Sequence, residues 1–505
     1  MKPLQARDIE PRVCELLALL ARHGHEGYVV GGGVRDLLRG KPAKDWDVAT
    51  SARPEEVMQR CKAARFHTVP TGLKHGTVTV LVAELPIEVT TYRGDGEYSD
   101  GRRPDRIEFV RTIEEDLARR DFTINALAYD PVADKLVDPY GGLADLEAGI
   151  IRAVGDAAAR FGEDGLRTMR AVRFAATLEM ALDPATQAAI PGALPVFRKV
   201  SAERVRDELT KLLGARRPSI GLYLMRDTGL LAEVLPELAK GVGLTQNRFH
   251  AYDVFEHTVR AVDATPGDAI TRLAALMHDV AKPVTAAPRE SAPGENSFFR
   301  HEIVGAELSD VVLRRLKFST EERERVVAVV KNHMFWYSDA WSDGTVRRFL
   351  RRVGPERIPE LFAVRIGDVV AHGKGKDPED ELGELRRRIT AVVEADQALK
   401  TSDLAIDGRD VMKQLGLPPS RRVGEVLEAL LERVLDEPGL NTREGLLALL
   451  PEVLAQVTAG GGGGGGGERP GSGTGTGTGV GAGVGRRVPG HPDGDGRSGD
   501  GSDGG

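Results

Sequence analysis

Two short motifs near the N-terminus contain residue types that bind phosphate and divalent metal. Residues 31–33 are three consecutive glycines after an apolar stretch, and glycine lets backbone N–H groups approach a phosphate closely. A helix predicted to begin at Val34 would point the positive end of its dipole at the same place. Asp45 and Asp47 follow on a segment predicted to be extended, where side chains two residues apart share one face. Such a carboxylate pair can hold Mg²⁺ ions that activate an attacking hydroxyl and neutralise a leaving pyrophosphate.

Each of these motifs alone has an ordinary explanation. A glycine-rich turn is usually only a turn, and two aspartates at a strand end are more often solvated than bound to metal. Two further polar motifs follow them, Arg-Arg-Asp-Phe-Thr-Ile-Asn-Ala at residues 119–126 and Glu-Asp-Gly-Leu-Arg at residues 163–167. The order and closeness of the first two motifs favour a catalytic site.

These four motifs, in this order between residues 28 and 213, resemble the class II tRNA nucleotidyltransferases and their relatives, the bacterial poly(A) polymerases. The resemblance implies an α+β fold, in which a polymerase-β-like head with a mixed or antiparallel sheet precedes an all-α neck, HD domain and body. It also implies that Asp45 and Asp47 are catalytic and bind Mg²⁺. In families of this chemistry a third carboxylate often joins the pair, and Glu88 is the candidate, with a surface glutamate as the alternative.

The resemblance also assigns nucleotide binding to residues of several motifs. Arg120 and Asp121 would fix the ribose and phosphates of the incoming nucleotide, and Asn125 would support the turn. The polar, glycine-rich segment 94–106 is predicted to be a mobile loop. In CCA-adding members, a loop at this place helps to switch the site from CTP to ATP. The complete set of predicted nucleotide-binding residues is Gly32, Arg35, Arg120, Asp121, Asp164, Arg167, Arg170 and Arg173.

Asp164, Arg167, Arg170 and Arg173 are spaced three residues apart and are predicted to face one cleft from a single helix. The Asp164 carboxylate would accept a hydrogen bond from the exocyclic amine of C or A, whereas U and G present a carbonyl there; Arg167 would donate to the acceptors of C. A carbonyl facing a carboxylate is a mismatch that can cost about 10⁴-fold. The family uses these two residues as a protein template, and Arg170 and Arg173 would neutralise triphosphate. Residues 201–209 resemble the neck motif that orients the template helix. An ordinary helix with an i, i+3 salt bridge is the alternative.

A second group of candidate residues lies far along the chain and consists of metal-ligand types. Imidazole and carboxylate ligands of this kind favour a transition metal such as Ni²⁺, Co²⁺ or Mn²⁺. The order H…HD…D is similar to the HD superfamily, although Ala281 stands where a glycine is common. The resemblance implies hydrolysis of phosphoester bonds, such as 2′,3′-cyclic phosphates on damaged tRNA ends; a relic fold with core histidines is the alternative. The predicted ligands are His257, His278, Asp279, His301, His333 and Asp368.

The elements that must position these residues change along the chain. Alternating patterns, among them a helical segment at 55–63 and extended, β-branched segments at 77–82 and 87–92, predict a nucleotidyltransferase head at 1–150. Helical periodicity then predicts a neck with the template helix at 151–243. The histidine-bearing segment 244–380 and a helical tRNA-binding body at 381–458 follow. Residues 459–505 form a glycine-rich tail predicted to be disordered, because it has almost nothing to bury.

Composition limits the possible classes of protein. The 505 residues exceed one hydrophobic core, and no run of 18 or more apolar residues suggests a membrane span. A net charge of −7 argues against a protein that coats nucleic acid indiscriminately. The two cysteines indicate neither a disulfide framework nor a zinc ribbon. Basic clusters, among them residues 347–352, 386–388 and 421–422, are predicted to contact RNA phosphates, with solvated helix faces as the alternative for any single cluster.

Together these features predict a cytoplasmic, Mg²⁺-dependent enzyme that adds CCA to the 3′ end of tRNA from CTP and ATP, without a nucleic-acid template. Its predicted partner is the tRNA acceptor arm, not DNA or a membrane. Poly(A) polymerase is the closest rival function, but the four arginines and five acidic residues of segment 460–505 differ from the strongly basic tail of such enzymes.

Two functions of a different class also fit parts of the sequence. One is an HD phosphohydrolase or nucleotide sensor with a ligand-binding head, and the second is a non-catalytic RNA-binding module. The presence of Asp45, Asp47 and Asp121 argues against both. The sequence leaves open the oligomeric state and whether one polypeptide adds all three nucleotides.

Overall fold

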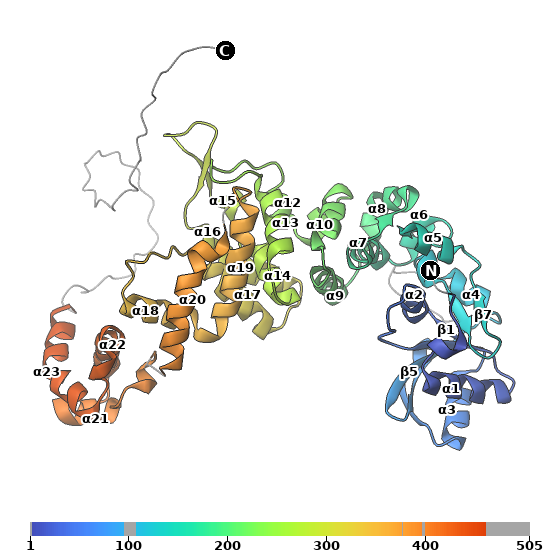
Figure 1. Ribbon diagram of the computed structural model, residues 1–505, viewed down its shortest axis with the longest axis horizontal. Helices are drawn as coiled ribbons and strands as arrows, with labels where there is room; N and C mark the ends of the chain where they lie inside the picture. The colour runs from blue at the N-terminus through green and yellow to red at the C-terminus, as the bar shows by residue number, and fades with distance from the viewer. Residues whose placement is uncertain (1–2, 95–107, 376, 396–398, 461–505) are drawn as a thin grey trace, which may run out of the picture.

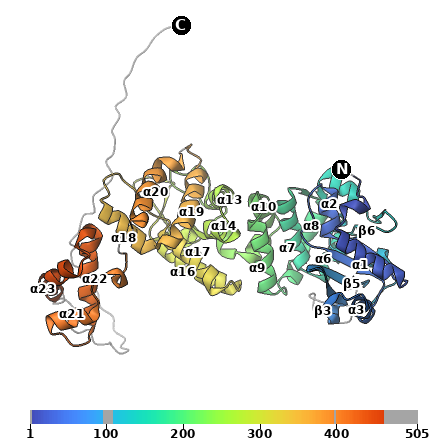
Figure 2. The ribbon, with the colours of Figure 1, turned by 60° about the horizontal axis from the view of Figure 1, so that its bottom comes forward.

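The computed structural model describes residues 3–94, 108–375, 377–395 and 399–460. The predicted nucleotide-switching loop at 94–106 lies outside the described residues except for Gly94, as does the glycine-rich tail after residue 460. The molecule is elongated, with a sheet-containing head at one end and the last three helices at the other (Figure 1). Helices connect these two ends in both views (Figures 1 and 2).

The N-terminal head alternates helices and strands, as the sequence predicts. The predicted helix at 55–63 and the predicted strands at 77–82 and 87–92 match three of these elements to within two residues. The head elements are α1 (Pro11–Arg22), β1 (Gly27–Val30), α2 (Gly32–Leu38), β2 (Asp47–Thr50), α3 (Pro54–Ala63), β3 (His67–Gly72), β4 (Thr77–Val82), β5 (Leu85–Thr91), α4 (Ile113–Ala118), β6 (Ala128–Asp130), β7 (Lys135–Val137) and α5 (Gly142–Ala148).

The head strands form one mixed sheet in the order β3-β4-β5-β2-β1-β6-β7. Strand β2 pairs antiparallel with β1 and parallel with β5, so it lies at the centre of the sheet. Along β4 fully buried residues alternate with partly buried ones, which is the pattern of a strand with one covered face. Helix α1 buries an apolar stripe that includes Leu16, Leu17 and Leu20 in the same core. This sheet fixes the start of β2 beside the middle of β5.

The neck is helical apart from two very short strands. Strands β8 and β9 pair in parallel and bring the start of the neck beside the end of α7. Gly221 allows a close helix contact, because a Cβ there would lie 3.1 Å from the carbonyl oxygen of Val172 in α7. The neck elements are β8 (Ile150–Ile151), α6 (Ala157–Glu163), α7 (Leu166–Leu178), β9 (Ala181–Leu182), α8 (Pro184–Phe197), α9 (Ala202–Leu213), α10 (Pro218–Asp227), α11 (Leu230–Val234) and α12 (Pro236–Ala239).

The histidine-bearing segment is helical with one short hairpin. The prediction of helices alone missed this hairpin, in which β10 and β11 are joined by a turn where Gly294 has a φ of 89° after Pro293. The elements are α13 (Val254–Ala264), α14 (Ala269–Met277), α15 (Lys282–Thr285), β10 (Ala286–Pro288), β11 (Asn296–Phe298), α16 (His301–Arg315), α17 (Thr320–Asn332), α18 (Asp343–Val353), α19 (Ile358–Ala371) and α20 (Pro378–Glu394).

The last three helices, α21 (Gly408–Leu415), α22 (Arg421–Asp436) and α23 (Arg443–Gly460), have their own apolar core. A separate, continuous core runs through the head, the neck and the helices up to α20. The predicted basic cluster at 347–352 joins these two parts. Arg348 donates to Glu432 at 2.8 Å and to Asp436 at 2.6 Å, both on α22. Arg348, which belongs to a cluster predicted to contact RNA phosphates, therefore pairs with acidic residues of the chain itself.

The predicted α+β fold class is confirmed, with a sheet-containing head followed by helices. None of the helices in the described ranges is both long enough and apolar enough to cross a membrane.

Candidate active site

A cavity of about 650 Å³ lies where the head meets α7. Its lining comes from β1, α2, β2 and β5 of the head and from α7 and α9 of the neck. Asp45 is the one predicted head or template residue that is absent from this lining. The predicted residues that do line the cavity are Gly32, Arg35, Asp47, Glu88, Arg120, Asp121, Asp164, Arg167, Arg170 and Arg173.

Two carboxylates stand side by side on neighbouring strands. Asp47 begins β2 and is the direct partner of Glu88 on β5 in the parallel register. The backbone N–H of Glu88 donates to the carbonyl oxygen of Trp46 at 2.9 Å, which fixes this register next to the two side chains. Burial raises the pKa of Asp47, and the negative charges of Glu88 and Asp45 raise it further. Hard, mutually repelling oxygen ligands of this kind suit Mg²⁺.

Asp45 is placed differently from the prediction. It is exposed and lies in a bend before β2 rather than on an extended segment, so the strand geometry that would align it with Asp47 does not apply. Its carbonyl oxygen would lie 3.3 Å from a Cβ at residue 33, so Gly33 permits the close approach of this bend to α2. Within the described part of the chain, the carboxylates of Asp45, Asp47 and Glu88 do not form a cluster with all ligand atoms within 4.8 Å.

The glycine motif brings the end of β1 close to both an arginine and an aspartate. Gly31 has a φ of 71°, a conformation that favours glycine. A Cβ at this position would lie 2.9 Å from Nη1 of Arg120 and 3.8 Å from Oδ2 of Asp47. Helix α2 then begins at Gly32 rather than at Val34. Residue 31 must therefore lack a side chain for this arrangement to form.

Asp121 is the centre of a buried hydrogen-bond network. Its Oδ1 accepts from Nδ2 of Asn125 at 3.0 Å, and Oδ1 of Asn125 accepts in turn from Arg35 at 2.7 Å. Its Oδ2 accepts from Nε of Arg170 at 2.7 Å. Burial opposes ionisation, but the charge of Arg170 and the hydrogen bond from Asn125 dominate and lower the pKa of Asp121 to about 2. The network therefore stays ionised at neutral pH and ties the head to α7.

Arg120 is held in the cavity wall by Asp116. Asp116 is almost completely buried, and its two oxygens accept from Arg119 at 2.7 Å and from Arg120 at 3.2 Å. Arg119 and Arg120 therefore both belong to one structural ion pair with Asp116. Arg120 still lines the cavity, where its guanidinium is close to the end of β1.

Asp164 lies between two helices and not on one, contrary to the prediction. Helix α6 ends at Glu163, Asp164 is extended, and α7 begins at Leu166. The intervening Gly165 passes so close to α8 that a Cβ there would lie 2.5 Å from the backbone of Phe197. Both oxygens of Asp164 accept from Arg204 of α9, at 3.2 and 2.6 Å. Arg204 was not predicted as a site residue, although it lies in the neck motif at 201–209.

The three arginines of α7 have different partners. Arg167 donates to the backbone oxygen of Arg119 at 2.9 Å and to Glu163 at 2.5 Å. Arg170 binds Asp121, as described above. Arg173 lies 3.6 Å from the ring centre of Phe174 and donates to the buried Glu208 of α9 at 2.6 Å. Arg173 is therefore a link between α7 and α9 as well as part of the cavity wall.

Comparison with known proteins decides the family. Three family models match consecutive parts of the chain: the poly A polymerase head domain at residues 27–152, the RNA- and SrmB-binding site of polymerase A at 179–241, and tRNA nucleotidyltransferase domain 2 at 302–450. The CCA-adding enzyme of Geobacillus thermodenitrificans is 36% identical over 439 residues, which are 86% of this chain and 95% of that protein. The chain belongs to the class II CCA-adding enzymes. It is a tRNA nucleotidyltransferase that adds CCA without a nucleic-acid template, which confirms the predicted activity over the poly(A) alternative.

Two more relatives of this CCA-adding enzyme are informative. The crystal structure of the Bacillus stearothermophilus CCA-adding enzyme in complex with CTP has 31% identity and a TM-score of 0.69, and the match covers 90% of this chain and all of that one. The A-adding tRNA nucleotidyltransferase of Deinococcus radiodurans is 37% identical over 431 residues, which are 81% of this chain and 92% of that protein. Members with different nucleotide preferences are therefore about equally similar to this enzyme.

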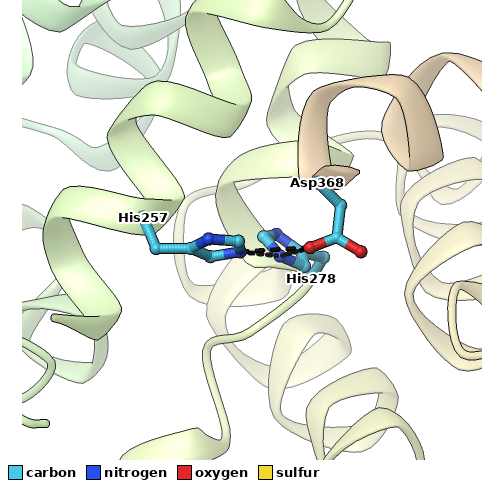
Figure 3. Close-up of side chains that lie close together, drawn as sticks. All are labelled: His257, His278 and Asp368. Atoms are coloured by element: carbon cyan, nitrogen blue, oxygen red, sulfur yellow. Dashed lines mark hydrogen bonds and ion pairs between the residues drawn. The ribbon is translucent and has the colours of Figure 1, made fainter. Parts of the chain in front are cut away.

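A second, separate cluster of side chains in the enzyme contains all six predicted HD ligands. The atoms of His257, His278 and Asp368 that could bind a metal lie within 4.8 Å of one another, and all three residues are buried. Figure 3 shows these side chains converging from separate segments, with Nε2 of His257 3.1 Å from Oδ1 of Asp368 and 3.3 Å from Nε2 of His278. A second triplet, buried in the same way, consists of Asp279, His301 and His333.

The two triplets meet at Asp279. One oxygen lies 3.1 Å from Nε2 of His278, and the other lies 3.3 Å from Nε2 of His301. Helix α14 ends at Met277, so His278 and Asp279 project from a helix end rather than from within a helix. Lys282 lies 2.6 Å from Asp279 and donates to Gln246 at 2.7 Å.

Backbone carbonyls fix the orientation of several of these histidines. Nδ1 donates to a carbonyl at 2.6 Å in His278, 2.8 Å in His301 and 2.7 Å in His333. Each Nε2 is left facing the cluster as a lone-pair donor. Burial lowers the pKa of His333 to about 3, helped by the neighbouring His278 and His301, so its imidazole is neutral. Lys282 pairs with Asp279 at 2.6 Å and Arg365 pairs with Asp368 at 2.8 Å, which favours the ionised form of both carboxylates. The donor set of neutral imidazoles and carboxylates fits a transition metal.

The sequence missed several residues around these two sites. Glu208 and Phe174 support the arginines of α7, and His250 and His372 flank the second cluster of side chains, with ring centres 4.6 Å apart. Phe174, His250 and His372 belong to no spacing pattern that identifies a ligand. Arg204 and Glu208 could have been found, because both lie in the neck motif at 201–209, which was already predicted to orient the template.

Proposed function

We propose that the enzyme binds CTP and ATP in the head cavity and joins them to the 3′ hydroxyl of the tRNA acceptor arm through Asp45, Asp47 and Glu88. The observation that carries this proposal is the convergence of two sets of residues on one cavity. Asp47 and Glu88 line the cavity from the strands of the head. Asp164 and the arginines of α7 line it from the neck. A nucleotide with its triphosphate near the strands would then present its base to the neck.

Mg²⁺ is the ion we propose for the carboxylates of Asp45, Asp47 and Glu88. When bound, it supplies activation of the attacking hydroxyl and neutralisation of the departing pyrophosphate. The oxygen-only donor set and the raised pKa of the buried Asp47 support a cation at this place. Asp45 is exposed on the bend before β2 and outside the cavity lining, so its side chain must turn toward Asp47 to share the ion.

The remaining cavity residues have separate tasks in this proposal. Arg120, Arg170 and Arg173 offset the charge of the triphosphate, while Gly32 and Arg35 complete the wall behind it. Asp121 positions Arg170 through a charged hydrogen bond at 2.7 Å. Asp164 and Arg167 read the edge of the base, and Arg204 orients the Asp164 carboxylate with two hydrogen bonds. Hydrogen bonds to neighbouring residues thus hold the side chains of both proposed base-reading residues in one orientation.

The same proposal includes a division of the chain into four parts: a head at 1–150, a neck at 151–243, a metal-binding segment at 244–380 and a tRNA-binding body at 381–458. The separate core of the last three helices supports the last of these limits. We place the activity in the cytoplasm, where bacterial tRNA is processed.

The direct test replaces the strand carboxylates. Asp47→Ala and Glu88→Ala should each reduce nucleotide addition below about a tenth of the wild-type kcat with Mg²⁺, because the site loses charge that holds the ion. Glu55→Ala is the matched control, since Glu55 is an exposed carboxylate of the same head on α3 and outside the cavity. Addition to tRNA lacking CCA is measured, with thermal unfolding as the check of folding. A variant Asp47→Ala that retains addition would refute the assignment.

A second activity is favoured by the two ligand triplets around Asp279. We propose that His257, His278, Asp279, His301, His333 and Asp368 bind a transition metal, with Ni²⁺, Co²⁺ or Mn²⁺ preferred over Mg²⁺, and that this site hydrolyses phosphoesters such as 2′,3′-cyclic phosphates. The burial of all six side chains and the carbonyl-fixed histidines support a built metal site.

The test of this second activity uses a double variant. His278→Ala combined with Asp279→Ala should eliminate metal-dependent hydrolysis of a 2′,3′-cyclic nucleotide and lower the content of bound transition metal, yet leave CCA addition close to the wild-type rate. The matched control is Glu307→Ala on α16, an exposed carboxylate of the same segment that should change neither property. Absence of metal-dependent hydrolysis in the wild type would refute the proposed activity.

A further inference from the structure

The metal-ligand cluster opens into a cavity of about 550 Å³ whose surface is largely apolar, with Phe249, Phe298, Met334, Phe335 and Trp336 among its lining side chains. Asp279, His301, His333 and Asp368 form its inner end. A small phosphate group needs no such wall, because phosphate is recognised by charges and hydrogen bonds. The apolar lining therefore points to a substrate with a large apolar or aromatic part attached to its phosphate.

Three large side chains of this lining are kept in contact with solvent. Trp336 is 65% exposed, Phe249 56% and Met334 54%. Exposed aromatic and thioether groups gathered around one opening mark a surface that is covered when a ligand binds. Among the described residues, neither Trp336 nor Phe249 stacks on another aromatic ring. The guanidinium of Arg248 lies 5.3 Å from the ring centre of Phe249, and ring faces without an aromatic neighbour are available to a planar partner.

The loops that carry these aromatic residues are anchored by their neighbours. Phe335, next to Trp336, is buried and packs on Phe349 and Phe362 with ring centres 5.1 and 6.2 Å away. Asn247 accepts the backbone N–H of Phe249 at 3.1 Å and also binds His250 at 2.9 Å. Trp336 and Phe249 are thus placed before a ligand arrives, which lowers the entropy cost of binding.

Positive charge is present beside the apolar wall. Lys282 and Lys374 both line the cavity, Lys282 at its buried end and Lys374 on the exposed side. The cavity thus combines aromatic side chains, cations and a metal-ligand cluster suited to phosphoester hydrolysis. This combination matches a nucleotide, whose base would stack on the aromatic side chains while its phosphate reaches the metal-ligand cluster.

We propose that Trp336 and Phe249 bind the nucleobase of the substrate at this site, so that the site selects nucleoside phosphoesters over base-free phosphoesters. This inference rests on the proposed phosphohydrolase function. In the hydrolysis of a 2′,3′-cyclic phosphate, water adds its oxygen to phosphorus, one ring P–O bond breaks, and the released sugar oxygen takes a proton to give a nucleoside monophosphate. The base takes no part in this step, so stacking should change KM and not kcat.

The first measurement compares two cyclic phosphates that differ only in the base. Adenosine 2′,3′-cyclic phosphate and methyl riboside 2,3-cyclic phosphate are hydrolysed with Mn²⁺ by the full chain. The wild type should show a KM for the adenosine compound that is lower by about tenfold or more. Trp336→Ala should remove this difference without changing kcat, Trp336→Phe should keep most of it, and Phe249→Ala should reduce it.

Phe299→Ala is the matched control, because Phe299 is 83% exposed in the same region but does not line the cavity. It should behave as the wild type does. An equal KM for both substrates in the wild type, or equal effects of Trp336→Ala and Phe299→Ala, would overturn the inference. The third substrate is an oligoribonucleotide that ends in the same 2′,3′-cyclic phosphate. A KM below that of the adenosine compound would identify an RNA end, rather than a free nucleotide, as the ligand.

A binding measurement separates the inference from the proposed activity. Stacking of 2-aminopurine riboside 3′-phosphate on an aromatic ring quenches its fluorescence, whether or not the site is catalytic. The Phe299→Ala variant should quench the probe more than the Trp336→Ala variant does. Any probe that binds in the head cavity is quenched equally in both variants, so it does not contribute to the difference. A wild type that hydrolyses neither cyclic phosphate refutes the phosphohydrolase alone; equal quenching by both variants refutes the base-binding role of Trp336.

Discussion

At the scale of single residues, the proposed selection of C and A depends on how the Asp164 carboxylate is held. Its two oxygens accept from Arg204, and its neighbour Arg167 is fixed by Glu163 and by the carbonyl oxygen of Arg119. Fixed donors and acceptors discriminate between bases because a wrong base leaves buried polar groups unpaired. A carboxylate that could rotate freely would instead turn away from a carbonyl and accept U or G.

The replacement of either partner tests this role of Asp164. Asp164→Ala should relax the rejection of UTP and GTP and weaken CTP and ATP, since the unfavourable pairing of two acceptors disappears along with the favourable one. Arg204→Ala should relax the selection in the same direction while it leaves Mg²⁺ dependence unchanged. The measurement is kcat/KM for each of the four nucleotides. Lys211→Ala, an exposed cation on the same helix α9, is the control. An equal loss for all four nucleotides would contradict the template role.

At the scale of elements, a close backbone contact positions the proposed template residues. Gly165 joins α6 to α7 and passes against the backbone of Phe197 at the end of α8. This contact sets the position of Asp164 on one side and of Arg167 on the other. The geometry of the proposed base-reading pair thus depends on Gly165, which has no side chain.

Gly165→Ala should therefore shift the template and destabilise the neck. The added Cβ would lie 2.5 Å from backbone atoms of Phe197, and a clash of this kind costs about 1–3 kcal/mol. Unfolding in urea should show the loss of stability, and misincorporation of UTP should rise. Gly162→Ala is the matched control on α6, because a Cβ there meets no atom within 4 Å. Equal stability of the two variants would contradict this role of Gly165.

The sequence predicted the elements of the head well and the connections between them less well. The alternating pattern of residues 77–82 specifies β4, since one face is buried and the other is not. The position of Asp45 could not be predicted, because a bend before a strand depends on its packing against α2. The break at Asp164 escaped prediction for a similar reason: helical spacing continues across it, and only the contact of Gly165 with α8 shows why the chain is extended there. Ion pairs between α18 and α22 depend on tertiary contact over more than 80 residues.

At the scale of the whole molecule, the two sites belong to different parts of an elongated chain. The head cavity is formed with α7 and α9, whereas the metal-ligand cluster lies among α13, α14, α16, α17 and α19 (Figure 1). One continuous apolar core packs the head, the neck and the helices up to α20 together, and both sites belong to this part of the chain. Because no described residue lines both cavities, changes in one site should leave the chemistry of the other site intact.

The measurement that tests the central claim most directly is the extension of a tRNA that lacks its 3′ CCA, followed by sequencing of the new 3′ ends. With CTP alone the enzyme should add two C residues and stop. CTP and ATP together should give complete CCA ends. UTP or GTP should give almost no addition, because in the proposed template Asp164 and Arg167 reject their bases. A tRNA that already ends in CC should accept a single A. A long A tail, or addition of A directly to the tRNA that lacks all three nucleotides, would contradict the account.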